Sequence, residues 1–110
     1  MEVVEAARFD VVLVALDPTV GSEIQKTRPC VVISPDEMNQ SMRTRVVAPM
    51  TTQGHLYPWR VPISFEGRSG RIALDQVRTV DQLRILKHLG NLDERTSHAA
   101  LKTLSEMFAP

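Results

Sequence analysis

Short runs of β-branched and aliphatic residues, each ended by proline, glycine or a polar turn, dominate the first eighty residues of the chain. Five such runs occur, at residues 9–16, 29–34, 45–50, 59–64 and 71–77. Runs of this length are typical of strands and too short for most helices. Pro49 near the end of the third run predicts a sheet edge or a bulge, and Pro62 interrupts the fourth, because proline cannot donate to a ladder.

Two segments favour helix. Residues 35–42 begin with proline and carry acids in their first turn, which is typical of a short helix. Residues 93–108 have Asp93 in position to cap a longer one, with Glu94 near the positive end of its dipole. The predicted core face of this C-terminal helix consists of Ala100, Leu101, Leu104, Met107 and Phe108. We therefore expect a mainly β, α+β fold: a small, strongly curved antiparallel sheet or SH3-like partly open barrel, with a short helix after strand two and a C-terminal α-helix.

A chain of 110 residues predicts one domain covering residues 1–110, since a second domain would lack a core. Its longest apolar run, residues 11–16, is far shorter than the roughly 20 residues of a membrane helix. Glu2 and Glu5 do not fit a secretory signal. Cys30 is the single cysteine, so no internal disulfide can form and structural zinc is not expected. These features predict a soluble, cytoplasmic protein with no membrane partner.

Charge is distributed unevenly along the chain. The formal net charge is zero, which argues against a generally basic nucleic-acid-binding domain. Residues 43–84, however, hold seven arginines and three acids, whereas residues 1–17 hold one arginine and four acids. Arginine outnumbers lysine ten to three, which favours phosphate recognition because the guanidinium fork matches phosphate oxygens. The alternative is that the basic middle is only a solvated sheet edge.

The connection between the first two predicted strands is unusually polar. Glu23, Lys26 and Arg28 lie within six positions, and Pro29 follows at once. Such residues can approach a ligand without breaking a ladder, and loops on a rigid sheet commonly carry sites. Gly21 gives this loop conformational freedom. A surface ion pair worth less than about 1 kcal/mol is the alternative interpretation.

A second polar cluster follows the third predicted strand, where Thr51 and Thr52 present hydroxyl groups. If strands two and three are neighbours, Arg28 at the start of one meets Thr51 at the end of the other. A carboxylate, a guanidinium and a hydroxyl would then share one cleft. That set suits phosphoryl chemistry, with a base, a cation for the developing charge and a neutral donor. We therefore predict that Glu23, Arg28 and Thr51 lie together.

The order of these motifs resembles that of the MazF/PemK family of toxin endoribonucleases from type II toxin–antitoxin systems. The resemblance is carried by LDP at 16–18, GSE at 21–23, RP at 28–29, PMT at 49–51 and DQ at 75–76. It implies a toxin that cuts single-stranded RNA, mRNA included, sequence-selectively, with no metal and no cofactor. It also implies a homodimer whose groove holds the substrate, and a cognate antitoxin protein as partner. Phe9 and Ala15 depart from the family pattern outside these motifs.

The resemblance also implies roles for individual residues. Arg28 matches the catalytic arginine, Thr51 its partner, and Glu23 a glutamate that is catalytic in some members. The attacking group would be the RNA's own 2′-hydroxyl, leaving 2′,3′-cyclic phosphate and 5′-hydroxyl ends. Asp75 and Gln76 are expected to hydrogen-bond neighbouring loops rather than to act on substrate.

Further residues are candidates for RNA contact. Lys26, Thr52 and His55 lie in the two polar connections, and Tyr57 and Trp59 bracket Pro58 beside the basic segment. Unpaired bases stack on such rings. Ordinary packing or a dimer contact is the alternative for both aromatic residues. His88 and His98 are predicted to lie away from the loop cluster.

Two rival functions remain open at this point. A related fold occurs in a toxin that binds and inhibits DNA gyrase without being an enzyme. A non-catalytic barrel that binds RNA or protein is the other possibility. The ordered motifs favour the ribonuclease, because a gyrase binder has no need of them.

Overall fold

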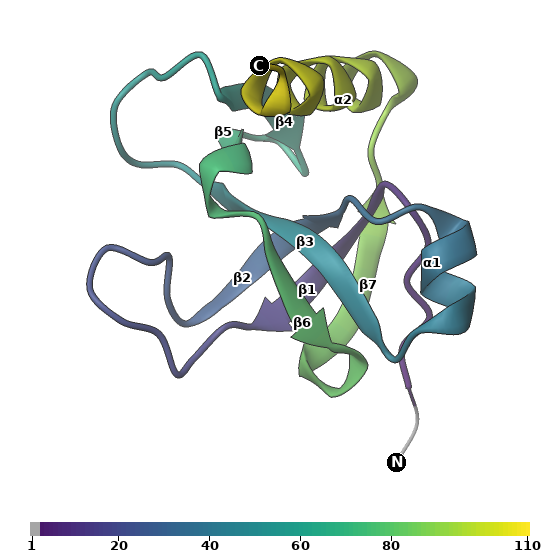
Figure 1. The fold of residues 1–110 in the computed structure, drawn as a ribbon. Coiled ribbons are helices and arrows are strands. Elements are labelled where there is room, and N and C mark those ends of the chain that lie inside the picture. Colours follow the sequence, from purple (N-terminus) through teal and green to yellow (C-terminus); the bar gives the residue numbers. More distant parts are fainter. Residues whose placement is uncertain (1–2) are drawn as a thin grey trace.

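The chain folds into one curled antiparallel sheet with a helix on either side of it, as the computed structural model shows for residues 3–110 (Figure 1). The strands are β1 (Asp10–Ala15), β2 (Thr27–Val32), β3 (Thr44–Thr51), β4 (Arg60–Phe65), β5 (Arg68–Ala73), β6 (Arg78–Asp81) and β7 (Ile85–Asn91). The helices are α1 (Asp36–Ser41) and α2 (Glu94–Phe108), with short 3₁₀ turns η1 (Leu74–Gln76) and η2 (Gln82–Arg84). The expected fold class is confirmed, including the short helix after strand two and the C-terminal helix. Among the described residues no helix is long and apolar enough to cross a membrane.

Strand β3 pairs with three other strands of the sheet, β2, β5 and β6. The order is β4-β5-β3-β2-β1-β7, and β6 also pairs with β3. On that side β3 pairs with β6 through residues 44–47 and with β5 through Met50 and Thr51. Pro49 falls between the two partners, so its missing N–H coincides with a gap in the pairing. The predicted edge or bulge is therefore a change of partner inside the sheet.

Three details of the strand prediction were wrong. The strands β6 and β7 were missed. β4 continues through Pro62, because β4 is an edge strand and proline is tolerated there. The fifth strand spans Arg68–Ala73 instead of residues 71–77, since the Glu66–Gly67 turn, with φ of +51° and +75°, reverses the chain in two residues. Asp75 and Gln76 consequently lie on η1 and not in a strand.

Alternation along β1 divides the core into two clusters. Val12 and Val14 face one cluster with Cys30 of β2, whereas Val11 faces the other with Val31. The second cluster also receives Ile63 of β4, Ile72 of β5 and Ala100 of α2. The side chains that remain partly exposed beside it, Met50, Phe65 and Leu89, border the candidate site described below.

Helix α2 covers the β4–β5 end of the molecule (Figure 1). Its predicted cap is confirmed: the Thr96 N–H donates to Asp93 Oδ1 at 2.6 Å, and this bond lowers the pKa of the Asp93 carboxyl. Its predicted core face was wrong in part, because Met107 is 37% and Phe108 74% exposed. The helix packs on β4 and η1, and its last turn extends past the core cluster. Helical spacing predicts a face but not where the underlying sheet ends.

Candidate active site

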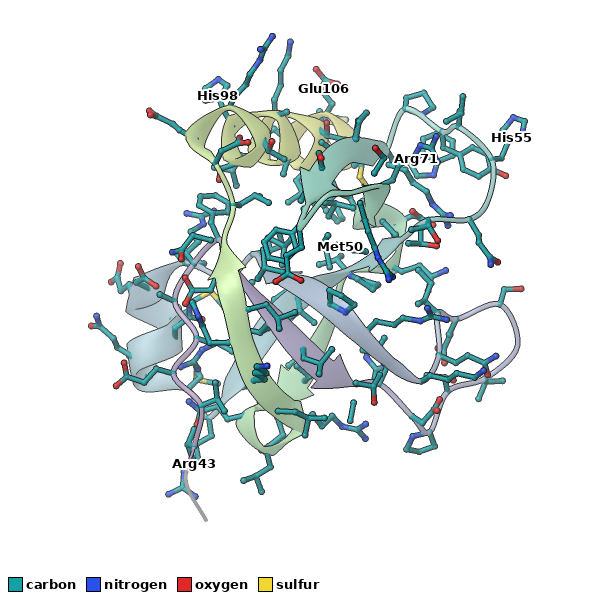
Figure 2. The ribbon with its side chains drawn as sticks, turned by 180° about the vertical axis from the view of Figure 1, so that it is seen from behind. Arg43, Met50, His55, Arg71, His98 and Glu106 are labelled. Atoms are coloured by element: carbon teal, nitrogen blue, oxygen red, sulfur yellow. The ribbon has the colours of Figure 1, made fainter. Side chains whose placement is uncertain are left out.

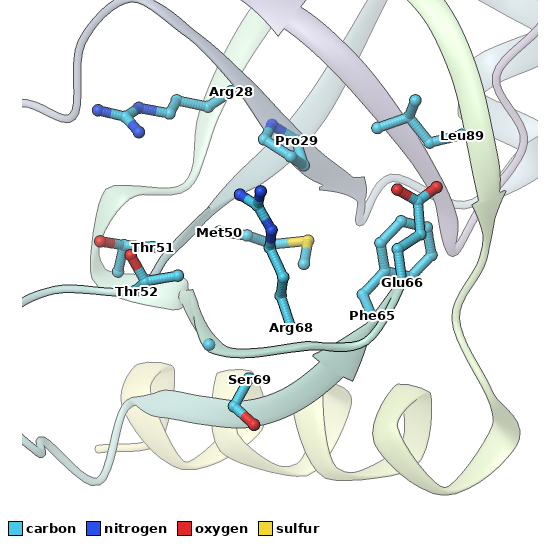
Figure 3. Close-up of a pocket in the computed structure, with 11 residues that line it drawn as sticks. Arg28, Pro29, Met50, Thr51, Thr52, Phe65, Glu66, Arg68, Ser69 and Leu89 are labelled. Atoms are coloured by element: carbon cyan, nitrogen blue, oxygen red, sulfur yellow. The ribbon is translucent and has the colours of Figure 1, made fainter.

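Strands β2 and β3 bring Arg28 and Thr51 to the same cleft. The β2–β3 pairing ends with Cys30 opposite Pro49, and Arg28 and Thr51 each lie two residues beyond that pair, where both line the cleft. The cleft, called here the β2–β3 cleft, has a volume of about 430 Å³. It is lined by Arg28, Pro29, Met50, Thr51, Thr52, Phe65, Glu66, Arg68, Ser69, Gly70 and Leu89 (Figure 3). The prediction that these two residues meet at one sheet edge is confirmed.

Arg28 presents an exposed guanidinium at one end of the cleft. Its Nε donates to the Gln25 carbonyl oxygen at 3.1 Å, which orients the group from within its own loop. Among residues 3–110 no acid lies within ion-pairing distance of Arg28. The exposed Arg28 guanidinium, oriented by Gln25 and not paired with an acid of residues 3–110, is therefore suited to bind an anionic ligand.

Thr51 ends β3 with its hydroxyl beside the cleft. The hydroxyl donates to the Gln53 carbonyl at 3.3 Å and accepts from the Gln53 N–H at 3.2 Å. The neighbouring strand β5 approaches the Thr51 backbone so closely that a Cβ on Gly70 would lie 3.0 Å from the Thr51 carbonyl oxygen. Glycine at position 70 is thus part of how Thr51 is positioned.

Glu23 does not share this cleft. It lines a neighbouring hollow, the Glu23 hollow, together with Pro49, Gln76 and Arg78. Its Oε1 accepts from the Val20 N–H at 2.7 Å within its own loop. The structure therefore brings together two of the three predicted residues and places the carboxylate beyond Pro49.

The bonds that hold the loop carrying Glu23 (residues 16–26, the β1–β2 loop) include those of the Gln76 and Asp17 side chains. Gln76 Oε1 accepts from the Ile24 N–H at 2.6 Å, and Gln76 Nε2 donates to the Ser22 carbonyl at 3.0 Å. Asp17 accepts from the Thr19 hydroxyl at 2.8 Å and from the Lys26 N–H at 3.1 Å, and these bonds lower the pKa of the Asp17 carboxyl. The predicted bonding to a neighbouring loop is confirmed for Gln76, whereas the Asp75 carboxylate binds Arg60 at the start of β4.

The candidate RNA-contact residues fall on two loops. Thr52 lines the β2–β3 cleft, and Lys26 is exposed at the base of the β1–β2 loop. His55, Tyr57 and Trp59 form a ladder on the β3–β4 loop, the loop at the right of Figure 2 that carries the His55 label. The Tyr57 and Trp59 rings lie parallel, with centroids 5.0 Å apart and an interplanar angle of 10°.

The Arg60 guanidinium packs against the Tyr57 ring of this ladder, and Asp75 holds it in place. The Arg60 guanidinium lies 5.5 Å from the Tyr57 ring centroid and makes two hydrogen bonds to Asp75, at 3.0 and 2.9 Å. The Asp75 carboxylate, through these bonds, raises the pKa of Arg60. Tyr57 and Trp59 are 39% and 38% exposed, so each ring keeps surface free for contact.

His88 and His98 do not line the β2–β3 cleft. His88 Nε2 on β7 is 3.4 Å from Asp10 Oδ2, and His98 is on α2, as predicted from the sequence. Within residues 3–110 no three His, Cys, Asp or Glu side chains gather closely enough to hold a metal ion.

The sequence predicts a turn at residues 67–70, but Glu66 and Arg68 were not predicted to be site residues. Glu66 and Arg68 both line the β2–β3 cleft, and Figure 3 shows Arg68 between the Thr51 end and the Glu66 end. The signal was available as a glycine flanked by two opposite charges in a predicted turn, but nothing in the pattern places that turn beside Arg28. Only the pairing of β5 with β3 does so.

The basic middle of the chain is largely structural. Arg45 donates to the Ala6 carbonyl, Arg78 to the Leu16 carbonyl, and Arg84 to the Ala15 and Asp17 carbonyls. Arg60 is bound by Asp75. The excess of arginine therefore mainly ties loops to the sheet, and Arg68 is the residue of this stretch that lines the cleft.

Comparison with known proteins places the chain in a family. Residues 7–108 match the family described as "PemK-like, MazF-like toxin of type II toxin-antitoxin system". The chain is 39% identical over 71 residues to the endoribonuclease toxin MazF of Escherichia coli K12, an alignment that covers 64% of each protein. It is 35% identical over 104 residues to the endoribonuclease PemK of Escherichia coli, covering 89% of this chain and 78% of PemK.

Solved structures share the fold. MazF from Deinococcus radiodurans superposes with a TM-score of 0.82 at 23% identity, covering 97% of both chains. A mycobacterial endoribonuclease solved in complex with its cognate antitoxin superposes with a TM-score of 0.80 at 18% identity, covering 96% of this chain and 98% of that one.

The curated relatives named above are called endoribonucleases, and the match to the family extends from β1 to α2. The resemblance drawn from the ordered motifs is thereby confirmed. The chain belongs to the PemK-like, MazF-like toxins of type II toxin–antitoxin systems.

Proposed function

We propose that this protein is the toxin of a toxin–antitoxin pair and an endoribonuclease that cleaves single-stranded RNA sequence-selectively without a metal ion. The observation that carries this proposal is the placement of Arg28 and Thr51 at one end of the β2–β3 cleft, with a guanidinium that no acid of residues 3–110 neutralises. Family membership supports the same reaction class.

RNA supplies the nucleophile for this reaction. The 2′-hydroxyl loses its proton and attacks the adjacent phosphorus, the bond to the 5′-oxygen of the next nucleotide breaks, and that oxygen takes up a proton. The products are a 2′,3′-cyclic phosphate and a 5′-hydroxyl. Arg28 stabilises the negative charge that develops on the phosphoryl oxygens, and Thr51 donates a hydrogen bond to orient the group. Arg28 also assists the leaving oxygen.

Glu23 is the proposed base for the 2′-hydroxyl. Its carboxylate lies in the Glu23 hollow, held through Oε1 by the Val20 N–H, so it reaches the cleft only when the β1–β2 loop moves. Lys26 belongs to the same loop and would approach the RNA backbone with it. The Gln76 bonds hold this loop, so they should affect how readily Glu23 reaches the cleft.

Bases beyond the cut are proposed to bind the β3–β4 loop. Thr52 leads from the cleft to the ladder of His55, Tyr57 and Trp59, in which the parallel Tyr57 and Trp59 rings offer a stacking surface. Stacking of a base on such a ring contributes about 1 to 3 kcal/mol and tolerates any base.

We also propose a homodimer and a cognate antitoxin as partners. The mycobacterial relative described above was solved with its antitoxin. A chain of zero net charge whose cleft carries free arginines suits an acidic, partly disordered antitoxin segment.

One assay tests the reaction. Purified protein is incubated with a long single-stranded RNA in EDTA, and both new ends are identified by sequencing and by their resistance to phosphatase treatment. We expect cleavage with cyclic phosphate and 5′-hydroxyl ends. A requirement for magnesium contradicts the mechanism, and absence of cleavage combined with gyrase trapped on DNA favours the gyrase-binding alternative.

A further inference from the structure

The β2–β3 cleft extends well past the residues that the proposed reaction uses. Arg28 and Thr51 occupy one end, Phe65 and Leu89 border the other, and Met50 lies between the two ends (Figure 3). Met50, Phe65 and Leu89 are partly buried against the second core cluster, so each presents a remaining apolar surface to the cleft. A phosphate or ribose gains little from such a wall, but a nucleobase stacks on it.

Phe65 is the aromatic part of that wall, and the sheet holds its ring in place. A Cβ on Gly90 of β7 would lie 3.1 Å from Phe65 Cζ and 3.2 Å from Cε1, so the ring packs directly over the glycine. The cleft volume of about 430 Å³ lies within the range of small-ligand pockets. There is thus a preformed apolar compartment next to the proposed phosphate position.

Two opposite charges stand at the rim of this compartment. Phe65 pairs with Arg68 across the two-residue turn, so their side chains share a face of the hairpin, and Glu66 occupies the turn itself. Among the described residues, Glu66 and Arg68 make no ion pair with each other or with any other charged group. A carboxylate and a guanidinium that stay apart leave both sets of hydrogen-bonding positions free for a ligand.

We propose that this end of the cleft is a guanine subsite for the nucleotide adjoining the cleaved phosphate, an inference that rests on the proposed ribonuclease function. Guanine is the RNA base whose pairing edge presents one acceptor beside two donors: O6, then N1–H and N2–H. Glu66 accepts from both donors with its two carboxylate oxygens, Arg68 donates to O6, and Phe65 contacts the ring. Adenine, cytosine and uracil each place an acceptor where guanine offers one of its two donors, which the carboxylate rejects.

The test measures cleavage and binding separately, with the full chain and Glu66→Gln. Glutamine keeps the size of glutamate but replaces one acceptor with a donor. Glu37→Gln, an exposed substitution on α1, is the matched control. Cleavage of a random-sequence RNA pool is read by end sequencing. Binding is read by fluorescence polarisation with oligonucleotides that carry a 2′-deoxy sugar at the cut, which blocks the reaction, and guanine, inosine or adenine at the subsite.

We expect guanine at one of the two nucleotides flanking the cut in the wild-type and Glu37→Gln proteins. Glu66→Gln should lose that preference at that position alone. Inosine lacks the N2 amine, so the inosine oligonucleotide should bind the wild type about tenfold more weakly than the guanine oligonucleotide does. Glu66→Gln should bind the inosine and guanine oligonucleotides with equal affinity.

Separate outcomes overturn the two proposals. Cleavage without guanine enrichment at either flanking nucleotide, or enrichment that Glu66→Gln leaves intact, overturns the guanine subsite and leaves the ribonuclease standing. Absence of cleavage with Glu66-dependent, guanine-selective binding overturns the ribonuclease and leaves the subsite. Absence of both overturns both.

Discussion

Arginine behaves differently on the two sides of Pro49. In the β2–β3 cleft, Arg28 and Arg68 face solvent, and no acid of residues 3–110 binds either of them. Around the Glu23 hollow, Arg60 is held by two bonds to Asp75, and Arg78 donates to the Leu16 carbonyl. The two regions are neighbours and have the same residue types. They differ in acid pairing: Asp75 binds Arg60, whereas among residues 3–110 no acid binds Arg28, which donates only to the Gln25 carbonyl.

This difference distinguishes arginines that can bind a ligand from arginines that support the fold. A guanidinium already bound by a carboxylate gains little from a phosphate, because it must first lose its partner. A guanidinium without one keeps its full attraction for an anion. The cleft is therefore the region in which substrate makes the missing contacts, and the hollow is the region that keeps the β1–β2 loop in place.

Of the substitutions considered, replacing Arg28 should lower the cleavage rate most. Removal of such an electrostatic donor typically lowers a reaction rate by about 10² to 10³, so Arg28→Ala should lose cleavage and toxicity. Its thermal midpoint and oligomeric state should stay those of the wild type, because the exposed side chain makes one hydrogen bond, to Gln25. Single-turnover cleavage and a melting curve measure the two effects.

The matched variant is Arg60→Ala, for which the opposite pattern is expected. It leaves Asp75 without its partner and should lower the free energy of unfolding by about 1 to 2 kcal/mol. Cleavage should fall far less than in Arg28→Ala. If instead Arg28→Ala unfolds, or becomes monomeric while the wild type is a dimer, Arg28 is a structural residue like Arg60 and not a substrate-binding one.

The sequence predicts elements better than their neighbours in space. A short run dominated by valine and leucine predicted β1, and the proline start and the Asp93 cap predicted α1 and α2, because these signals act within a few residues. The strands β6 and β7 were missed because their polar, charged composition shows no clear apolar period. The exposure of Phe108 depends on where the sheet beneath α2 ends, which helical spacing does not encode.

The same distinction applies to the site. Arg28 and Thr51 could be joined from sequence because one pairing, β2 with β3, suffices to align them. Glu23 could not be placed, because an eleven-residue loop has many routes and two bonds from Gln76, 52 and 54 residues away, select this one. Glu66 and Arg68 enter the cleft only through the additional pairing of β5 with β3.

Loosening the β1–β2 loop should produce a smaller effect than removing Arg28. Gln76→Ala deletes the bonds to Ile24 and Ser22, each worth about 1 kcal/mol net. Hydrogen exchange of the Ile24 amide should become about tenfold faster, while amides of β1 keep their protection. Gln40→Ala on α1 is the control and should change neither.

Cleavage by Gln76→Ala then reports on Glu23. If Glu23 acts as the base and reaches the cleft by movement of the loop, loosening the loop should raise the rate, and Glu23→Gln should abolish this gain in the Gln76→Ala background. A gain that persists without Glu23, or a loss of rate, would mean that Gln76 affects the cleft by another route.

Acidification should give the smallest effect and act on the other anchor of the loop. The Thr19 hydroxyl first, and then the Lys26 N–H, lower the pKa of Asp17 below its ordinary value of 3.8. A carboxyl whose pKa is lower in the folded state stabilises the fold above the unfolded pKa and loses this contribution as the pH falls through the folded one. Asp17→Asn keeps an oxygen for Lys26 but does not titrate. The urea midpoint of the wild type should therefore exceed that of Asp17→Asn near neutral pH, and the difference should shrink as the pH falls below the ordinary carboxyl pKa of 3.8. A difference that is the same at both pH values would show that the Asp17 charge does not stabilise the loop anchor.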